Sequence, residues 1–88
     1  MYKVLVVEDS LTVRKIVNKL IEDNPHFTCD LCEDLAEAKS ALESDTEYLA
    51  AIVDLNLPDA PNGESVELAL SYNVPTIVLT GNFDEFTR

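Results

Sequence analysis

The 88-residue sequence has few basic residues and no long apolar run. Six lysines and arginines stand against seventeen aspartates and glutamates, which gives a net charge of −11. Binding to a phosphate backbone requires Lys and Arg, so this composition argues against nucleic-acid binding by the segment. No apolar run approaches the roughly 20 residues of a membrane span, and the first residues lack the regions of a signal peptide. We therefore expect a cytoplasmic protein that attracts cations and basic partner surfaces and has no membrane partner.

Cysteine and histidine are also scarce, which limits metal and redox chemistry. Cys29 and Cys32 are the two cysteines, and a zinc site would need more ligands than these and His26, the one histidine. A redox pair needs one thiol at a helix N-terminus, where the thiol pKa falls, but both cysteines lie in a segment that predicts a strand. Residues three apart on a strand point to opposite faces. We expect packed, reduced thiols.

Apolar residues make up 47% of the chain, which is sufficient for the core of one domain over residues 1–88. Three predicted strands are apolar without alternation, as in a parallel sheet that helices cover on both faces. Segments with helical spacing lie between the strands, so the order β-α-β-α-β-α-β predicts right-handed crossovers and a mostly parallel sheet. The predicted strands are residues 4–7, 27–32, 49–53 and 76–79.

Each predicted helix has a start signal or an apolar face. Ser10 is a plausible N-cap of the first helix, and Asp34 with Glu37 resembles a capping box at the start of the second. A third helix is predicted over residues 64–72, after a loop with two prolines and a glycine. The predicted inner faces are Val13, Ile16, Val17, Leu20 and Ile21 in the first helix, Leu35, Ala38, Ala41 and Leu42 in the second, and Val66, Ala69 and Leu70 in the third.

Polar side chains follow three of the predicted strands. Glu8 and Asp9 follow the first strand, Asp54 follows the third, and Thr80 follows the fourth. In open parallel sheets ligands bind just beyond the carboxyl ends of the strands, so these residues form a candidate site. A carboxylate such as Asp54 can act as a nucleophile toward phosphorus and form an aspartyl phosphate. Mg²⁺ takes oxygen ligands, which Glu8, Asp9 and the backbone carbonyl of Asn56 could provide.

Each of these residues also has a simpler interpretation. An Asp after a strand is commonly a turn former, and Glu8 and Asp9 could merely complement a helix dipole. Thr80 with Gly81 could be an ordinary turn. The concurrence of all three at strand ends favours an ion site, because clustered acids raise one another's pKa and destabilise a fold that holds no cation.

Three motifs resemble the receiver domain of bacterial two-component response regulators: residues 4–10 (VLVVEDS), residues 53–58 (VDLNLP) with Gly63, and residues 78–81 (VLTG). The resemblance implies an α/β, flavodoxin-like, doubly wound parallel sheet with the strand order 2-1-3-4 over these residues. It implies that Asp54 accepts a phosphoryl group from a phosphohistidine on a sensor kinase or phosphotransfer protein. By the same resemblance, the Mg²⁺ ligands are Glu8, Asp9, Asp54 and the Asn56 carbonyl, and Thr80 is the switch hydroxyl.

The resemblance also implies a partner surface. The first helix of such domains docks the histidine-bearing partner, and Arg14, Lys15 and Asn18 would be its exposed contacts. A receiver of this kind is not an enzyme toward a separate substrate, and at most it phosphorylates and dephosphorylates itself with Mg²⁺.

The sequence departs from the receiver pattern at its C-terminal end. Receivers continue through a fourth helix, a fifth strand with a phosphate-binding lysine and an aromatic residue, and a fifth helix. The 88 residues contain neither of these two side chains, so we expect a fragment of a longer regulator, incomplete at its C-terminus. We also expect an uncovered apolar face, self-association through edge pairing or exchange of the tail at residues 83–86, and weak or absent phosphorylation.

Two other functions remain open at this point. A pseudo-receiver would act as an interaction module that does not switch by phosphate. A phosphatase of the haloacid dehalogenase type also uses a strand-end Asp and Mg²⁺, but it needs a second Asp two residues later as general acid. Asn56 occupies that position, and an amide cannot donate and retrieve the proton.

Overall fold

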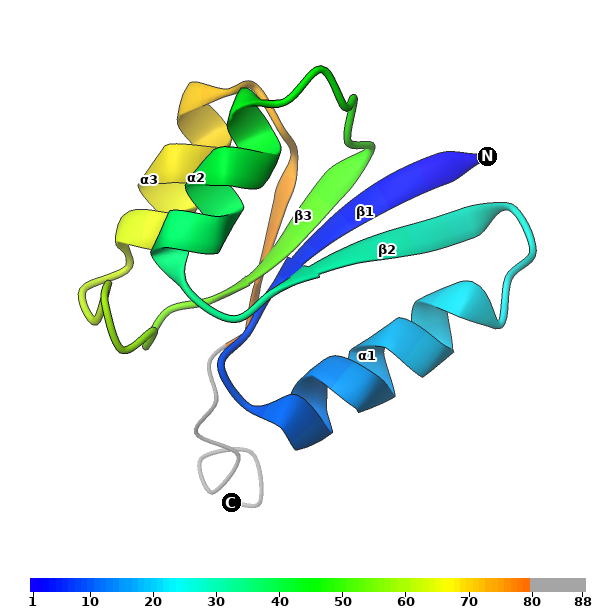
Figure 1. Cartoon of the computed structure of the whole chain (residues 1–88), viewed down its shortest axis with the longest axis horizontal. Helices are drawn as coiled ribbons and strands as arrows, with labels where there is room; N and C mark the ends of the chain where they lie inside the picture. The colour runs from blue at the N-terminus through cyan, green and yellow to red at the C-terminus, as the bar shows by residue number, and fades with distance from the viewer. Residues whose placement is uncertain (80–88) are drawn as a thin grey trace.

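The computed structural model describes residues 1–79, which form a four-stranded sheet and three helices (Figure 1). The order of elements agrees with the prediction, although β1 begins earlier than expected and β3 includes Asp54. Thr80 and the tail expected to exchange between subunits lie outside the described residues. The elements are β1 (Tyr2–Val7), α1 (Leu11–Glu22), β2 (Phe27–Cys32), α2 (Leu35–Glu43), β3 (Ala50–Asp54), α3 (Glu64–Ser71) and β4 (Thr76–Leu79).

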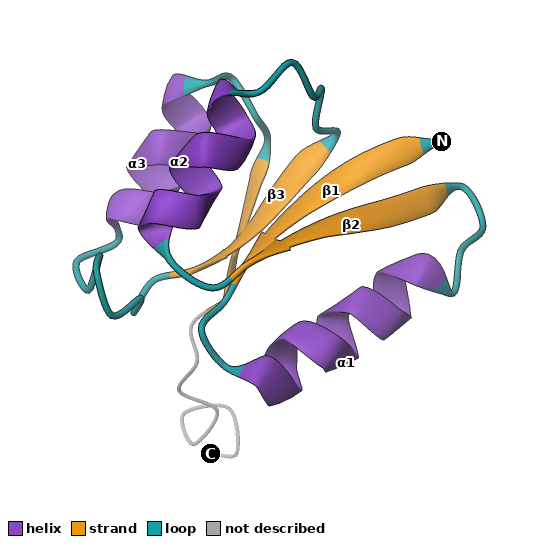
Figure 2. Ribbon diagram, viewed as in Figure 1, coloured by secondary structure: helices purple, strands orange, loops and turns teal. Residues whose placement is uncertain are grey.

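The strands are parallel and lie in the order β2-β1-β3-β4. Helix α1 lies on one face of the sheet, and α2 and α3 lie on the other (Figure 2). This arrangement confirms the predicted flavodoxin-like, doubly wound sheet with the strand order 2-1-3-4. In the register between β1 and β3, Val7 pairs with Val53, so Glu8 and Asp54 each follow one member of the same pair. The two acids therefore reach the same edge of the sheet.

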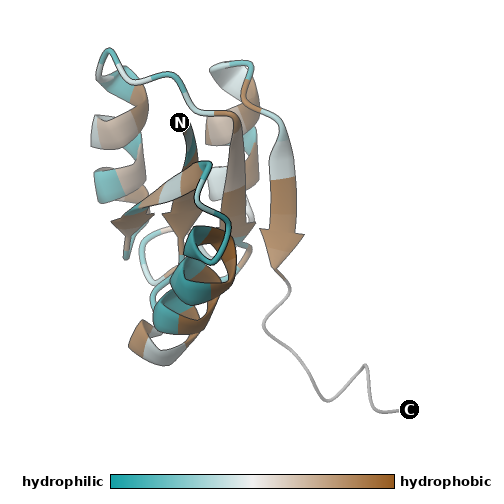
Figure 3. Cartoon of the chain, turned by 90° about the vertical axis from the view of Figure 1, so that its right-hand side faces the viewer, coloured by the Kyte–Doolittle hydropathy of each residue, from teal (hydrophilic) through white to brown (hydrophobic). Residues whose placement is uncertain are grey.

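The core lies mainly between the sheet and the pair α2 and α3. Leu5, Val7 and Val53 are at most 1% exposed and belong to this core with Ala38 and Ala69. The strand ribbons are mostly apolar when the molecule is viewed from its side (Figure 3). Burial of an aliphatic side chain of this size contributes about 1.5–3 kcal/mol, so this layer supplies much of the driving force for folding.

The predicted caps of α1 and α2 are present. The Ser10 hydroxyl accepts a hydrogen bond from the Val13 amide at 3.3 Å, and the Asp34 carboxylate accepts one from the Glu37 amide at 2.9 Å. The capping box is shifted by one residue, because the Glu37 carboxylate accepts from the Glu33 amide at 2.8 Å and not from the cap itself. Both helices thus begin where the sequence predicts.

The inner faces of α1 and α3 differ in part from the prediction. Helix α1 has no buried residue, and Ile16 and Leu20 are 54% and 68% exposed. The reason is that α1 packs mainly along β2 and also on β1, near one edge of the sheet. In α3, Leu70 is 55% exposed, whereas Ser65 and Ala69 are buried. The predictions for Ile16, Leu20 and Leu70 were therefore wrong.

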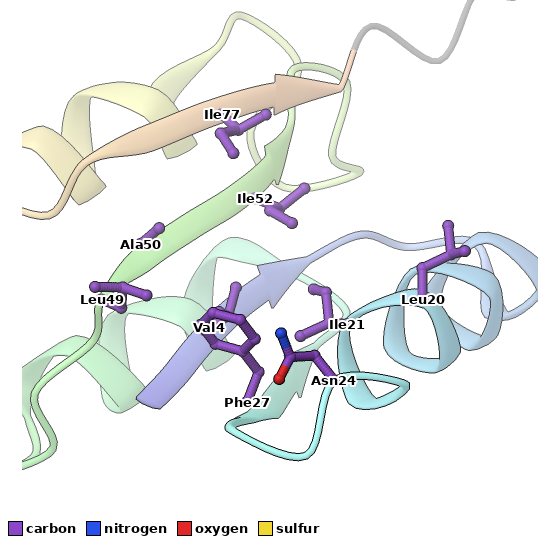
Figure 4. A pocket seen from close by; sticks show the side chains of 9 residues that line it. All are labelled: Val4, Leu20, Ile21, Asn24, Phe27, Leu49, Ala50, Ile52 and Ile77. Carbon is purple, nitrogen blue, oxygen red and sulfur yellow. The ribbon is translucent and has the colours of Figure 1, made fainter. Parts of the chain in front are cut away.

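An apolar groove remains open between α1 and the middle of the sheet (Figure 4). Its walls come from α1 and from all four strands, and they include Leu20, Ile21, Ile52 and Ile77. Ile77 lies on β4, which pairs with β3 alone among the strands of residues 1–79, and its side chain is 57% exposed. The described part of the chain thus leaves the expected apolar face uncovered.

The two cysteines are free thiols on β2, as predicted. Cys32 is buried in the core and Cys29 is half-buried. Burial raises the pKa of each thiol to about 11, and nearby carboxylates add to the effect. Both thiols therefore remain protonated at neutral pH. No helix within residues 1–79 has the length and apolar character that crossing a membrane requires.

Candidate functional site

Glu8, Asp9 and Asp54 converge at the carboxyl edge of the sheet. One carboxylate oxygen from each of the three residues lies within 4.8 Å of the others. Glu8 and Asp54 are each 5% exposed, while Asp9 is exposed to solvent. Because the β1–β3 register fixes the positions of Glu8 and Asp54, the cluster is a consequence of the fold and not of flexible surface side chains. The predicted convergence of these acids is confirmed.

The Asp54 carboxylate is oriented by the loop that follows it. Its Oδ1 accepts a hydrogen bond from the Asn56 amide at 3.0 Å. The backbone carbonyl of Asp54 accepts a hydrogen bond from the hydroxyl of Ser65 at 2.8 Å, and Ser65 is 2% exposed. The residue is thus held from β3, from the β3–α3 loop and from α3. Ser65 is a site residue that the sequence does not reveal, because a serine in a short amphipathic helix carries no distinguishing pattern.

The loop between β1 and α1 is held by Arg14. The Nη1 atom of Arg14 donates to the carbonyl of Glu8 at 2.7 Å and to the carbonyl of Asp9 at 3.0 Å. Its Nη2 lies 3.7 Å from Oε2 of Glu33, and the Arg14 side chain is only 13% exposed. The Glu8 carboxylate in turn accepts from the Ser10 amide at 3.0 Å. These bonds fix the backbone that carries both acids.

The prediction that Arg14 is an exposed partner contact is therefore wrong. Its guanidinium reaches back over the preceding loop, which a residue in the first turns of a helix can do when free carbonyls lie beside it. Lys15 is exposed and Asn18 is partly exposed, so their docking role stays a prediction.

The β3–α3 loop is compact. Leu57 and Ala60 are buried, and the Ala60 amide donates to the Leu57 carbonyl at 3.1 Å to close a turn with Pro58 in its second position. The Gly63 amide donates to the Leu55 carbonyl at 3.2 Å. Gly63 has φ +80°, and a Cβ there would lie 3.3 Å from the Leu55 side chain. The loop thereby fixes the backbone of Asn56 close to Asp54.

The cluster carries uncompensated negative charge. Burial raises the pKa of Glu8 from 4.5 to about 7, and repulsion from Asp54 adds to the effect, although the hydrogen bond from the Ser10 amide opposes it. In the described part of the chain, the ion pairs involve Asp30 and Glu33 and none of the three clustered acids. A proton or a cation is needed to relieve the repulsion among the acids.

The donor set fits a hard divalent cation. Carboxylate and carbonyl oxygens are the ligands that Mg²⁺ prefers, and Mg²⁺ usually takes one or two carboxylates and completes its shell with water and phosphate oxygens. Glu8, Asp9 and Asp54 offer carboxylates at one point, and the Asn56 carbonyl belongs to the adjoining loop. No nitrogen or sulfur donor belongs to the described cluster, which argues against a zinc-type site.

Several solved structures are similar to this chain. A putative two-component system response regulator/GGDEF domain protein is 36% identical, with a TM-score of 0.81, over 100% of this chain and 35% of that chain. The MaeR response regulator bound to beryllium trifluoride is 23% identical, with a TM-score of 0.80, over 99% of this chain and 76% of that chain. The non-phosphorylated HemR receiver domain from Leptospira biflexa is 21% identical, with a TM-score of 0.77, over 100% of this chain and 73% of that chain.

These comparisons differ in what they show. The last two similarities, at 23% and 21% identity, show the fold. The response regulator/GGDEF domain protein is also similar in sequence, because more than a third of the aligned residues are identical, and this chain spans about a third of that longer protein. No family model matches the sequence, and neither does any curated protein. The chain thus has the fold of the receiver domains of two-component response regulators, and it resembles one such regulator in sequence.

Proposed function

We propose that this receiver domain accepts a phosphoryl group on Asp54 and requires a divalent cation, Mg²⁺ by its ligand chemistry, to do so. The observation that carries the proposal is the cluster of three carboxylates within 4.8 Å at the carboxyl edge of the sheet. Two of its members are almost fully buried, an arrangement that costs stability in the absence of a cation. The domain would act as a signalling module and not as an enzyme toward a separate substrate.

Glu8, Asp9 and Asp54 would hold the cation, with the Asn56 carbonyl as a further ligand. When bound, the cation supplies positive charge that offsets the repulsion between the carboxylates and an incoming phosphoryl group. The chain itself contributes orientation. The Asn56 amide and the Ser65 hydroxyl hold Asp54 in place, and Arg14 fixes the backbone of Glu8 and Asp9.

The proposed reaction transfers a phosphoryl group from an imidazole nitrogen to a carboxylate oxygen. A carboxylate oxygen of Asp54 forms a bond to phosphorus, and the bond between phosphorus and the imidazole nitrogen of a phosphohistidine breaks. The imidazole leaves with the electron pair and can then take up a proton. The phosphohistidine would belong to a sensor kinase or a phosphotransfer protein, with Lys15 and Asn18 of α1 among the docking contacts. Thr80, the proposed switch residue, lies outside the described residues.

Incubation with a small phosphodonor, followed by intact-mass measurement, tests this proposal. We expect a fraction of the chain to gain one phosphoryl group in the presence of Mg²⁺ and none after chelation of the metal. The fraction should be low, because the 88 residues contain no lysine after Lys39 that could pair with the phosphoryl oxygens. Asp54→Asn is the control and should gain nothing. Equal modification of wild type and Asp54→Asn would overturn the proposal.

A further inference from the structure

The turn in the β3–α3 loop is attached to a distant helix by one side chain. Both carboxylate oxygens of Asp59 accept hydrogen bonds from the N-terminus of α2. The Leu35 amide donates to Oδ1 at 2.9 Å and the Ala36 amide donates to Oδ2 at 3.2 Å. These partners are 24 and 23 residues away in sequence. The contact therefore joins the β3–α3 loop to the start of α2, two segments that are far apart in sequence.

Helix α2 already has its own cap. Asp34 accepts from the Glu37 amide, which satisfies one of the free donors at the start of a helix. Asp59 takes the two preceding amides, so the terminus carries two carboxylates from two different segments. Asp34 is part of the β2–α2 connection and fixes only the helix. Asp59 is an exposed residue in the loop beyond Asp54, and its bonds restrain that loop.

The segment from Asp54 to Asp59 is short and is fixed at both ends. At one end, Asp54 belongs to β3, and its side chain accepts from the Asn56 amide. At the other end, Asp59 lies in the turn that begins at the buried Leu57 and is bound to α2. Asn56, whose carbonyl is the proposed fourth ligand, lies between the two anchors. Release of the second anchor would leave the Asn56 backbone held through Asp54, through the backbone hydrogen bonds of Leu55 and through the turn at Leu57, but no longer through α2.

We propose that Asp59 is a positioning residue of the cation site, which holds the Asn56 carbonyl and the Asp54 carboxylate in register by anchoring their loop to α2. The inference rests on the proposed function, because it assumes that the acidic cluster binds a divalent cation. It has a reciprocal consequence: if the α2 anchor favours cation binding, cation binding must strengthen the anchor by the same factor. Groups that orient metal ligands in this way typically contribute about 10-fold to 100-fold in metal affinity.

A matched pair of variants in the full 88-residue chain tests this role. Asp59→Ala and Asp34→Ala each remove one carboxylate and one negative charge from the same helix terminus. We expect Asp59→Ala to weaken Mg²⁺ binding about 10-fold in calorimetric titration. Asp34→Ala should weaken Mg²⁺ binding far less, although its loss of thermal stability should be comparable with that of Asp59→Ala. Asp59→Asn, which keeps one acceptor oxygen without the charge, should give an intermediate affinity and serves if the alanine variant folds poorly.

A second readout does not depend on the metal. In the metal-free chain, hydrogen exchange of the Asn56 amide should accelerate in Asp59→Ala and stay near the wild-type rate in Asp34→Ala. If both variants change affinity and exchange equally, Asp59 is only a helix cap and the inference fails while the proposed function stands. If the wild-type chain binds no divalent cation at all, the proposed function fails together with the inference.

Discussion

Replacement of Glu8 by glutamine should make the metal-free protein more stable at alkaline pH. Gln has the same shape and can still accept the hydrogen bond that the Ser10 amide donates to Oε1 of Glu8. It removes the charge that burial and Asp54 disfavour. The raised pKa of Glu8 means that the folded state binds a proton more tightly than the unfolded chain does. This residue therefore contributes most to stability at low pH, and the contribution is lost as pH rises from 4.5 to about 7.

The size of the effect follows from the pKa. A rise from 4.5 to about 7 corresponds to about 3 kcal/mol of lost stability for wild type above pH 7, at about 1.4 kcal/mol per pH unit. At pH 5 most of that loss has not yet occurred, and the difference should be about 1 kcal/mol or less. Urea denaturation of wild type and Glu8→Gln without metal, at pH 5 and at pH 8, measures both values.

Saturating Mg²⁺ should reverse the order of stability at pH 8. The wild-type chain gains stability from the cation according to its affinity, and Glu8→Gln, with one carboxylate fewer, gains less. A Glu8→Gln variant that is no more stable than wild type at pH 8 without metal would refute the claim that the buried charge of Glu8 destabilises the metal-free fold. The claim would also fail if the gain in stability of Glu8→Gln over wild type were the same at pH 5 as at pH 8.

Three further predictions concern other parts of the molecule. Arg14→Ala should weaken Mg²⁺ binding about 10-fold, because it frees the loop that carries two of the acids, while Lys19→Ala on the exposed face of α1 should not; equal effects in the same titration would contradict the assigned role. Because the groove is open and β4 is an edge strand, we expect the 88-residue chain to self-associate at micromolar concentration and Ile77→Lys to reduce this self-association. A wild-type chain that sediments as a clean monomer would contradict the prediction. Gly63→Ala should lower the free energy of unfolding by about 1–2 kcal/mol because of its positive φ, and an unchanged urea midpoint would rule out that constraint.

The sheet and the acidic site could be predicted because both depend on local signals. Apolar runs without alternation predict strands buried on two faces, and the right-handed crossover rule then leaves few topologies. Once the sheet is parallel, all carboxyl ends lie at one edge, so Glu8, Asp9 and Asp54 were expected at the same edge. The remaining uncertainty was the register, and the pairing of Val7 with Val53 resolves it in favour of a cluster.

The side-chain errors have a common physical cause. Periodicity shows which side of a helix is apolar, but it does not show whether another element covers that side. Ile16 and Leu20 have the correct spacing and still lie largely in solvent, because α1 packs near the edge of the sheet. The opposite error occurs in α3, where the small polar Ser65 is buried because its hydroxyl bonds to the Asp54 carbonyl.

The long-range polar contacts could not be predicted from spacing. Arg14 looks like any basic residue on the polar face of a helix, yet it holds the backbone of the preceding loop. Asp59 looks like an ordinary turn residue beside a proline, yet both of its oxygens bind a helix more than twenty residues away. These roles depend on which elements the fold brings together, and that information is not local.

Titration of the isotope-labelled chain with Mn²⁺, followed by amide NMR, tests the cation site most directly. A paramagnetic ion held by Glu8, Asp9 and Asp54 should broaden the signals of these residues and of Asn56 first, at substoichiometric metal, and Asp54→Asn should abolish the effect. Broadening that instead spreads over exposed acids ahead of the amino end of β3, such as those between residues 43 and 47, with none confined to the carboxyl edge of the sheet, would contradict a built cation site.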